Sequence, residues 1–188
     1  MLLKKSDFLN SIDPKRAFAG QESCTAKLRR YLSATATIGG PKRRGLVPVL
    51  LRTVMEADAE HVASLLAELG YPSNEADIRN RLRHRLHSQT SCFLLAQSAS
   101  EVIGFVSAEL VPYFPNGSTI CRVTALIVSI NHRGRRVGER LLSGAADFAR
   151  EHHCSGIEIT SAEHRIEAHR FYQRVGFTRT SFRFFQAL

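Results

Sequence analysis

A glycine-containing turn, Arg133-Gly134-Arg135-Arg136-Val137-Gly138, constrains the fold of this chain more than any other stretch. The residues before it, 123–128, are apolar and partly β-branched, which is typical of a buried strand. The residues after it place apolar side chains on one helical face: Val137, Leu141, Leu142, Ala145, Phe148 and Ala149. The sequence therefore predicts a strand that passes through a tight turn into an amphipathic helix.

Three arginines, Arg135, Arg136 and Arg140, crowd the start of this predicted helix. A helix N-terminus already carries about half a positive charge, so further cations there are mildly destabilising on their own. Free backbone N–H groups and arginine side chains would together hold an anion, and a phosphate is the natural one. The alternative interpretation is a solvated, arginine-rich helix start that binds nothing.

Two common phosphate loops do not fit this turn. A P-loop needs Gly-Lys-Ser/Thr at its end, whereas Gly138 is followed by Glu139 and Arg140. A dinucleotide fingerprint needs three glycines in the pattern GxGxxG, and only Gly134 and Gly138 are present.

The charge of the chain is unevenly distributed. The net charge is +9 over 188 residues; residues 1–45 hold ten Lys and Arg against three acids (+7), and residues 46–188 carry only +2. The breaker sequence Gly39-Gly40-Pro41 reads as a linker. We therefore predict a basic, poorly ordered N-terminal extension at 1–45 and one folded domain at 46–188. The sharper alternative for the extension is an electrostatic docking arm for nucleic acid, a membrane or an acidic partner.

The remaining composition indicates a cytoplasmic protein without a membrane span. No apolar run approaches the roughly 20 residues that a span needs, and the start does not resemble a signal peptide. The four cysteines, Cys24, Cys92, Cys121 and Cys154, form no CxxC pair, so we expect idle thiols and no metal site.

The pattern of the chain predicts strands and helices in an α+β, or mixed α/β, arrangement. The expected strands lie at 47–54, 91–97, 102–111, 120–128 and 156–160, with a final aromatic strand or pair of strands at 177–187. A first helix is stopped by Gly70, a second is opened by Pro72-Ser73-Asn74, and the last is ended by Gly176.

Two further segments accompany the turn in a familiar order. Arg133–Gly138 resembles the coenzyme A pyrophosphate loop, Arg-x-x-Gly/Ala-x-Gly, of the GNAT (Gcn5-related N-acetyltransferase) superfamily. Residues 165–177 are similar to its later element R-x-x-A-x-x-F-Y-x-x-x-G-F, and residues 55–59 look like its first strand-to-helix junction. The resemblance covers 46–188 and implies a central mixed, mostly antiparallel sheet flanked by helices.

The chain departs from the family at the fourth loop position, which is usually glycine and is Arg136 here. Because Gly134 and Gly138 remain, we expect Arg136 to have a helical φ and its side chain to reach the phosphates.

The resemblance implies acetyl-CoA as co-substrate and no metal. The strand end Leu126, Ile127 and Val128 would lie beside the pantetheine arm, and the pyrophosphate would rest on Arg133, Gly134, Arg135, Arg136, Val137 and Gly138, with Glu139 and Arg140 at its edge. Tyr172 is the candidate general acid toward the leaving thiolate. Its alternative is a packed aromatic beside Phe171.

The general base is less well marked. Many family members carry a glutamate on the strand before the loop, where this chain has Thr124. Glu109 on the preceding strand is our first candidate, with His164 and His169 as alternatives; each also fits a surface or packing role.

These features predict transfer of an acetyl group from acetyl-CoA to a primary amine of a small molecule or peptide by direct attack. The alternative is a non-catalytic acyl-CoA-binding regulatory module, which the missing carboxylate at Thr124 slightly favours. Nucleic acid is expected to bind only through the basic extension, and a homodimer is compatible with the sequence.

Overall fold

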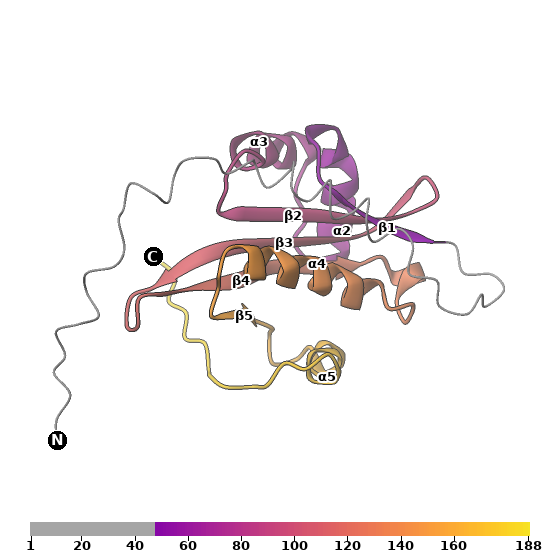
Figure 1. Cartoon of the computed structure of the whole chain (residues 1–188). Helices are drawn as coiled ribbons and strands as arrows, with labels where there is room; N and C mark the ends of the chain where they lie inside the picture. Colours follow the sequence, from indigo (N-terminus) through magenta and orange to yellow (C-terminus); the bar gives the residue numbers. More distant parts are fainter. Residues whose placement is uncertain (1–47) are drawn as a thin grey trace, which may run out of the picture.

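The computed structural model describes residues 48–188 (Figure 1), so the predicted extension at 1–45 lies outside the described residues. A five-stranded sheet in the order β1-β2-β3-β4-β5 forms its centre. The strands are β1 (Val49–Thr53), β2 (Ser91–Ser98), β3 (Glu101–Tyr113), β4 (Ser118–Val128) and β5 (Gly156–Ile159). The first four are antiparallel to their neighbours and β5 is parallel to β4. The predicted mixed, mostly antiparallel sheet is confirmed.

Helices cover both faces of this sheet and create two apolar clusters. On one face lie α2 (Ala59–Leu69) and α3 (Glu75–Arg85), which pack on Leu95, Phe105 and Ile127. On the other face lies α4 (Val137–Glu151), with α5 (Ile166–Arg174) against the same cluster (Figure 1). Two short 3-10 helices complete the fold. η2 (Glu56–Asp58) precedes α2, and η3 (Ile130–His132) precedes the turn at 133–138. None of the helices within 48–188 combines the length and the apolar character needed to cross a membrane.

The helix ends follow the predicted signals. Gly70 ends α2 with φ +96°, and Gly176 follows α5 with φ +97°. The N–H of Phe177 donates to the carbonyl of Tyr172 at 2.9 Å, which is the predicted Schellman closure. The side chain of Asn74 accepts a hydrogen bond from the N–H of Asp77 at 2.8 Å and caps α3.

A nearly buried ion pair joins β1 to the start of α2. Asp58 is 5% exposed and accepts hydrogen bonds from Arg52 Nη1 at 2.7 Å, Arg52 Nη2 at 2.6 Å and the N–H of Met55 at 2.8 Å. Burial alone would raise the pKa of Asp58, but the hydrogen bonds from Arg52 and Met55 outweigh it and hold the pKa below its ordinary value. The strand-to-helix junction is therefore fixed by a paired carboxylate.

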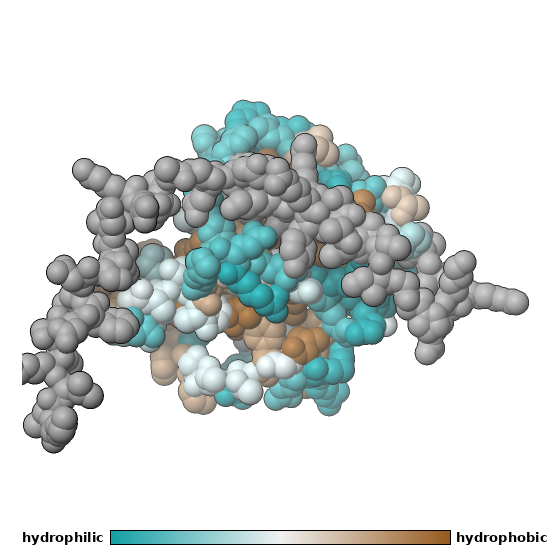
Figure 2. Space-filling view, viewed as in Figure 1, coloured by the Kyte–Doolittle hydropathy of each residue, from teal (hydrophilic) through white to brown (hydrophobic). Residues whose placement is uncertain are grey.

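The final strand predicted at 177–187 is wrong, because the described chain has no regular structure after α5. Phe184 and Phe185 are 93% and 80% exposed, and the Arg183 guanidinium lies 5.7 Å from the Phe185 ring centre. Figure 2 shows the C-terminal segment arching away from the body and leaving an opening beside it. Aromatic strand propensity depends on packing against neighbours, and these exposed rings pack on no strand of the described chain.

Candidate active site

β4 and β5 run side by side over only part of their length. Their parallel pairing ends where Val123 lies opposite Ile159. β4 continues to Val128 with β3 as its only strand partner in the described chain. The backbone groups of residues 124–128 that face away from β3 therefore lack a strand partner. We call this open edge between the two strands the fork.

A β-bulge lies where the fork begins. Ser107 pairs with Ala125 and Ala108 with Val123, so Thr124 is an extra residue on β4. Its Oγ1 lies 2.6 Å from Ser107 Oγ. A bulge bends its strand and increases the local twist, which favours divergence from β5. Thr124 thus occupies the position where many family members carry a glutamate, and its hydroxyl is paired with that of Ser107.

The strand residues predicted to lie beside the pantetheine arm line the fork with their main chain. Ile127 is 3% exposed and packs on the α2–α3 side. Leu126 and Val128 pack on the α4 side. Because these side chains enter the two apolar clusters, only backbone N–H and C=O groups remain for a ligand at the open edge.

The turn after β4 contains two residues in the left-handed region. Gly134 has φ +74° and Arg136 has φ +62°, so the expected helical φ at Arg136 is wrong. The chain must reverse before α4, and Arg136 is the N-cap residue of that helix. Its guanidinium Nε donates to Glu139 Oε2 at 2.7 Å, an ion pair within the first helical turn. The usual family glycine fits this conformation better than arginine does.

We expect Arg136→Gly to raise the free energy of unfolding by about 0.5–1 kcal/mol, because glycine adopts a left-handed φ without strain. The lost Arg136–Glu139 pair is exposed and contributes little. Urea unfolding measures the change. Arg135→Gly is the matched control. Because Arg135 has no positive φ, this variant should have a lower free energy of unfolding than the wild type. Equal destabilisation of both variants would contradict this account.

The start of α4 offers unpaired backbone donors. Its N-cap side chain makes no capping bond, and the first helical hydrogen bond runs from the N–H of Arg140 to the carbonyl of Arg136 at 3.2 Å. The N–H groups of Val137, Gly138 and Glu139 therefore have no acceptor within the helix. The positive end of the helix dipole lies at the same place.

The arginines of the turn divide into bonded and unbonded ones. Arg133 Nε donates to the carbonyl of Val128 at 3.1 Å, and Arg136 pairs with Glu139. Within residues 48–188, Arg135 and Arg140 have no ion-pair partner, and both are exposed. An anion at the helix start would thus meet free amides and two available guanidinium groups.

Gly138 allows α5 to pack against the first turn of α4. A Cβ atom at this position would lie 3.1 Å from the ring of Phe171, tighter than ordinary packing permits. The helix start that offers the free amides is therefore in direct contact with α5. Sequence reasoning attributed this glycine to the ligand alone and missed the packing role.

Tyr172, the candidate acid, follows Phe171 on α5. Its ring centre lies 5.4 Å from that of Phe171 and 6.0 Å from that of Phe177. Burial raises the pKa of the Tyr172 phenol, and the positive charge of Arg165 partly opposes this. The hydroxyl makes no hydrogen bond to any other described residue. The phenol is therefore packed, protonated at neutral pH and free to donate.

Arg165 connects the two sides of the sheet near the fork. Its Nη2 donates to the carbonyl of Leu69 at 2.6 Å, so the start of α5 is joined to the end of α2. The N–H of Ile130, after β4, donates to Glu68 Oε2 at 3.0 Å. The C-terminal end of α2 thus contacts both segments that border the fork. Arg165 belongs to the recognised sequence element, but nothing in its spacing predicted this contact.

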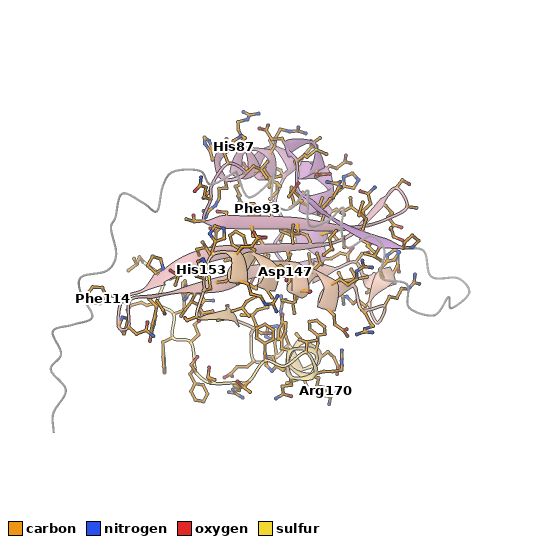
Figure 3. The ribbon with its side chains drawn as sticks, in the orientation of Figure 1. His87, Phe93, Phe114, Asp147, His153 and Arg170 are labelled. Atoms are coloured by element: carbon orange, nitrogen blue, oxygen red, sulfur yellow. The ribbon has the colours of Figure 1, made fainter. Side chains whose placement is uncertain are left out.

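Glu109, the candidate base, lies apart from Tyr172. Its carboxylate accepts from Ser91 Oγ at 2.7 Å and pairs with Arg85 of α3 at 2.7 Å. It faces the α2–α3 side, whereas α5 lies across the sheet, as the positions of His87 and Arg170 show (Figure 3). His164 is exposed before α5, and His169 is half-buried on it.

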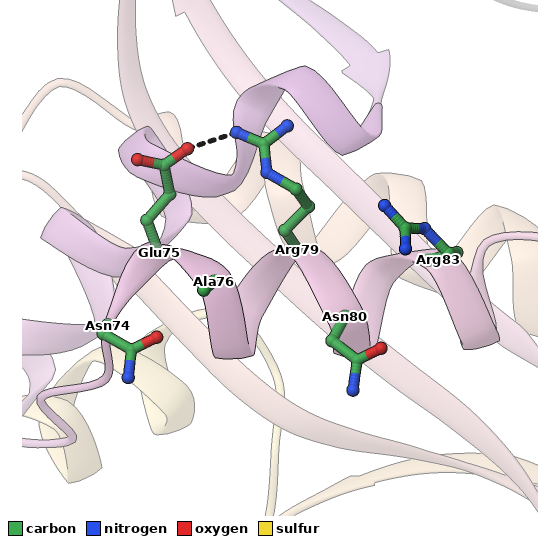
Figure 4. Close-up of a pocket in the computed structure, with 6 residues that line it drawn as sticks. All are labelled: Asn74, Glu75, Ala76, Arg79, Asn80 and Arg83. Atoms are coloured by element: carbon green, nitrogen blue, oxygen red, sulfur yellow. Dashed lines mark hydrogen bonds and ion pairs between the residues drawn. The ribbon is translucent and has the colours of Figure 1, made fainter.

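Other chemistry-bearing residues of the described chain do not add to this site. Burial raises the pKa of the Cys121 thiol to about 12, so it supplies no thiolate at neutral pH. Among residues 48–188, no three His, Cys, Asp or Glu side chains are grouped to hold a metal ion. An open depression of about 590 Å³ lies on α3 between Asn74 and Arg83 (Figure 4), and it contains none of the predicted site residues.

Known acetyltransferases resemble this chain in sequence. The model of the acetyltransferase (GNAT) family matches residues 43–177. Aminoalkylphosphonate N-acetyltransferase from Salmonella typhimurium is 30% identical over 151 residues, which is 78% of this chain and 97% of that protein. N-acetyltransferase family 8 member 2 from Rattus norvegicus is 28% identical over 106 residues, covering 56% of this chain and 46% of the rat protein. The chain thus spans less than half the length of the rat relative.

The same fold is found in solved structures. Aminoglycoside N-acetyltransferase AAC(6')-Iy in complex with CoA has a TM-score of 0.70 at 17% identity and covers 78% of this chain and 99% of that one.

Proposed function

Since this chain belongs to the GNAT family of acetyltransferases, it is an acetyl-CoA-dependent N-acetyltransferase, and we propose that its acceptor is the primary amine of a small molecule. The aminoalkylphosphonate N-acetyltransferase relative, which aligns over nearly its whole length, supports a small amine over a peptide. The observation that carries the donor side of the proposal is that three features border one apolar cluster: the fork, the free start of α4 and Tyr172.

The co-substrate site proposed here uses the start of α4 and the fork together. The amides of Val137, Gly138 and Glu139, with Arg135 and Arg140, would hold the pyrophosphate. Arg133, Gly134 and Arg136 would shape the turn beneath it. The pantetheine arm would lie along the open edge of Leu126–Val128 and hydrogen-bond the main chain there, as a strand would.

The proposed reaction is a direct transfer. A neutral amine attacks the thioester carbonyl, a C–N bond forms, and the C–S bond breaks. The amine proton passes to a base, and the Tyr172 phenol gives its proton to the leaving sulfur. A backbone N–H at the fork would stabilise the oxyanion. The raised pKa of Tyr172 supports the role of acid, because it keeps the proton on the phenol until the thiolate forms.

Glu109 remains our candidate for the base, acting through water. Its contacts with Arg85 and Ser91 keep its carboxylate in place at the α2–α3 side of the sheet. Ser107 lies two residues before Glu109 on β3, and its hydroxyl pairs with Thr124 at the start of the fork. A proton would travel between the fork and Glu109 along this polar side of the strands.

Charge reversal at Arg135 is expected to weaken acetyl-CoA binding about tenfold or more, because it replaces an available donor by a repelling carboxylate. Titration calorimetry of the Arg135→Glu variant measures the change. Arg81→Glu on α3 is the matched control, since Arg81 is exposed and distant from the turn. A similar loss in both variants would make the effect one of net charge and would contradict the loop assignment.

The acceptor class is tested by following thiol release from acetyl-CoA with aminoalkylphosphonates, amino sugars and short peptides. We expect turnover with small amines and little with peptides. Turnover restricted to peptides would overturn the small-molecule proposal. Tight acetyl-CoA binding without any turnover would instead favour a non-catalytic binding module.

A further inference from the structure

A row of polar side chains crosses β2, β3, β4 and β5 on the α2–α3 side of the sheet. Glu109 on β3 lies opposite both Ser91 on β2 and Arg122 on β4, and Arg122 lies opposite Glu158 on β5. The strand neighbours of these residues pack into the α4-side cluster, so the alternation of side chains turns the row toward the other face. We call these four residues, together with Arg85 of α3, the charged row.

Two ion pairs hold the charged row together. Arg85 Nη2 lies 2.7 Å from Glu109 Oε1, and Arg122 Nε donates to Glu158 Oε1. Ser91 Oγ donates to Glu109 Oε2 at 2.7 Å. A guanidinium carries several N–H donors in a rigid plane, so an arginine that is oriented by one carboxylate keeps donors for a second anion. The row therefore presents two oriented guanidinium groups.

The charged row can be reached from solvent. The side chains of Arg85 and Arg122 are 54% and 48% exposed, and those of Glu158 and Glu109 are 39% and 19% exposed. A dissolved molecule can thus contact both guanidinium groups without displacing a helix or a strand. Exposed ion pairs contribute little to stability, so the fold itself gives little reason for this row.

The formal charges of the row balance, because two arginines face two glutamates. A ligand that carries only positive charge would meet carboxylates that are already paired and guanidinium groups that repel it. A ligand with both an amine and an acid group complements both signs, since its acid can bind a guanidinium while its amine lies beside a carboxylate. Charge complementarity therefore favours an amino acid in the broad chemical sense.

The charged row lies close to the fork. Arg122 precedes Thr124, the bulged residue where the fork begins, by two positions, or about 7 Å along a strand. Glu109 follows Ser107, the partner of Thr124, by the same number of positions on β3. A short aminoalkyl chain spans such a gap. An acid group held at Arg122 would thus leave the amine of the same molecule at the fork.

We propose that the acceptor is a short aminoalkyl acid and that Arg122, with Arg85 beside it, binds the acid group. This inference rests on the acetyl transfer to a small amine proposed above, and it adds that the amine carries a carboxylate, sulfonate or phosphonate. Arg122 is then a residue that determines acceptor specificity. It holds the acid group on the α2–α3 side, and the amine reaches the fork from there.

Two substrates of nearly identical shape test the charge requirement. 3-Aminopropanoate and 3-aminopropanamide differ in the acid group alone, and 2-aminoethylphosphonate extends the comparison to a tetrahedral acid. Steady-state kinetics are compared at equal concentrations of the neutral amine, because only this form attacks. We expect the wild type to have a kcat/KM at least about tenfold higher with one of the two acids than with the amide.

Arg122→Gln should abolish this preference. The substitution removes the charge that binds the acid, so KM for the preferred acid should rise about tenfold or more while kcat/KM for the amide stays within about twofold of wild type. Arg122→Lys keeps the charge without the planar fork and should retain part of the preference. Because the Arg122–Glu158 pair is exposed, the melting temperature of both variants should stay near wild type.

Arg150→Gln is the control on the other side of the sheet. Arg150 of α4 forms an equally exposed pair with Asp147 at 2.6 Å, so its replacement removes one positive charge and one surface ion pair. Both substrates should react with this variant as with the wild type.

Four outcomes would overturn the inference. A wild type that prefers the amide, or that does not distinguish it from the acids, would leave the proposed function standing without an acid group on the acceptor. A preference that persists in Arg122→Gln would remove Arg122 from acceptor binding. An equal loss with acids and amide in Arg122→Gln would show that Arg122 acts through the fold. Absence of turnover with any small amine, despite acetyl-CoA binding, would overturn the proposed function and this inference together.

Discussion

Replacement of Tyr172 by phenylalanine is expected to lower the turnover number of acetyl transfer by about 100-fold or more. The ring contacts with Phe171 and Phe177 survive this change, and only the hydroxyl is lost. Because that hydroxyl makes no hydrogen bond within the described chain, the free energy of unfolding and the acetyl-CoA affinity should stay near wild type. Steady-state kinetics, calorimetry and urea unfolding measure the three quantities.

The pH dependence sharpens this test. The phenol is active while protonated, so the alkaline limb of wild-type turnover should appear as the pH rises through the raised pKa of Tyr172, above the ordinary value of 10.0. Tyr172→Phe should lack this alkaline limb. Tyr113→Phe, on the β3–β4 hairpin, is the matched control and should behave as wild type. Unchanged turnover in Tyr172→Phe would leave thiolate protonation to water.

Asp58→Asn should lower the free energy of unfolding by about 3 kcal/mol, because it leaves the Arg52 guanidinium partly buried without its carboxylate. Urea unfolding at neutral pH measures this loss. Asp147→Asn is the matched control, since the Asp147–Arg150 pair is exposed and should contribute less than about 1 kcal/mol. Equal effects of the two substitutions would contradict a special role for Asp58.

At acidic pH, the difference in the free energy of unfolding between wild type and Asp58→Asn should disappear. The pKa of Asp58 is lowered in the folded state, so its stabilising contribution is complete above the unfolded value of about 3.8 and is lost as the pH falls through the lowered value. The two unfolding curves should therefore converge in strongly acidic solution. A difference that persists there would show that the ionised carboxylate is not its cause.

Local signals predicted most of the elements of this fold. Gly70, Asn74 and Gly176 have conformational or capping roles that act within a few residues, so their positions can be predicted without knowledge of distant contacts. The aromatic run at Phe182–Phe185 misled the prediction because strand formation requires a neighbouring surface. Whether such a surface exists depends on residues far away in the sequence.

The candidate site also combines features that local sequence predicts with contacts between residues that are distant in the sequence. The turn at Arg133–Gly138 and the position of Tyr172 could be predicted from spacing. The left-handed φ of Arg136 was missed, since a non-glycine residue is an unusual choice there. The contacts of Arg165 with Leu69 and of Glu109 with Arg85 join residues that only the folded sheet brings together.

The sheet separates two apolar clusters that support different parts of the molecule. The turn at 133–138, α4 and Tyr172 all rest on one cluster, while α2 and α3 rest on the other. Substitutions on the outer surface of α2 and α3, away from Glu109 and from the contacts of Glu68 and Leu69, therefore leave the first cluster intact. A chain built in this way can vary one face of its sheet during evolution while the other face is held constant.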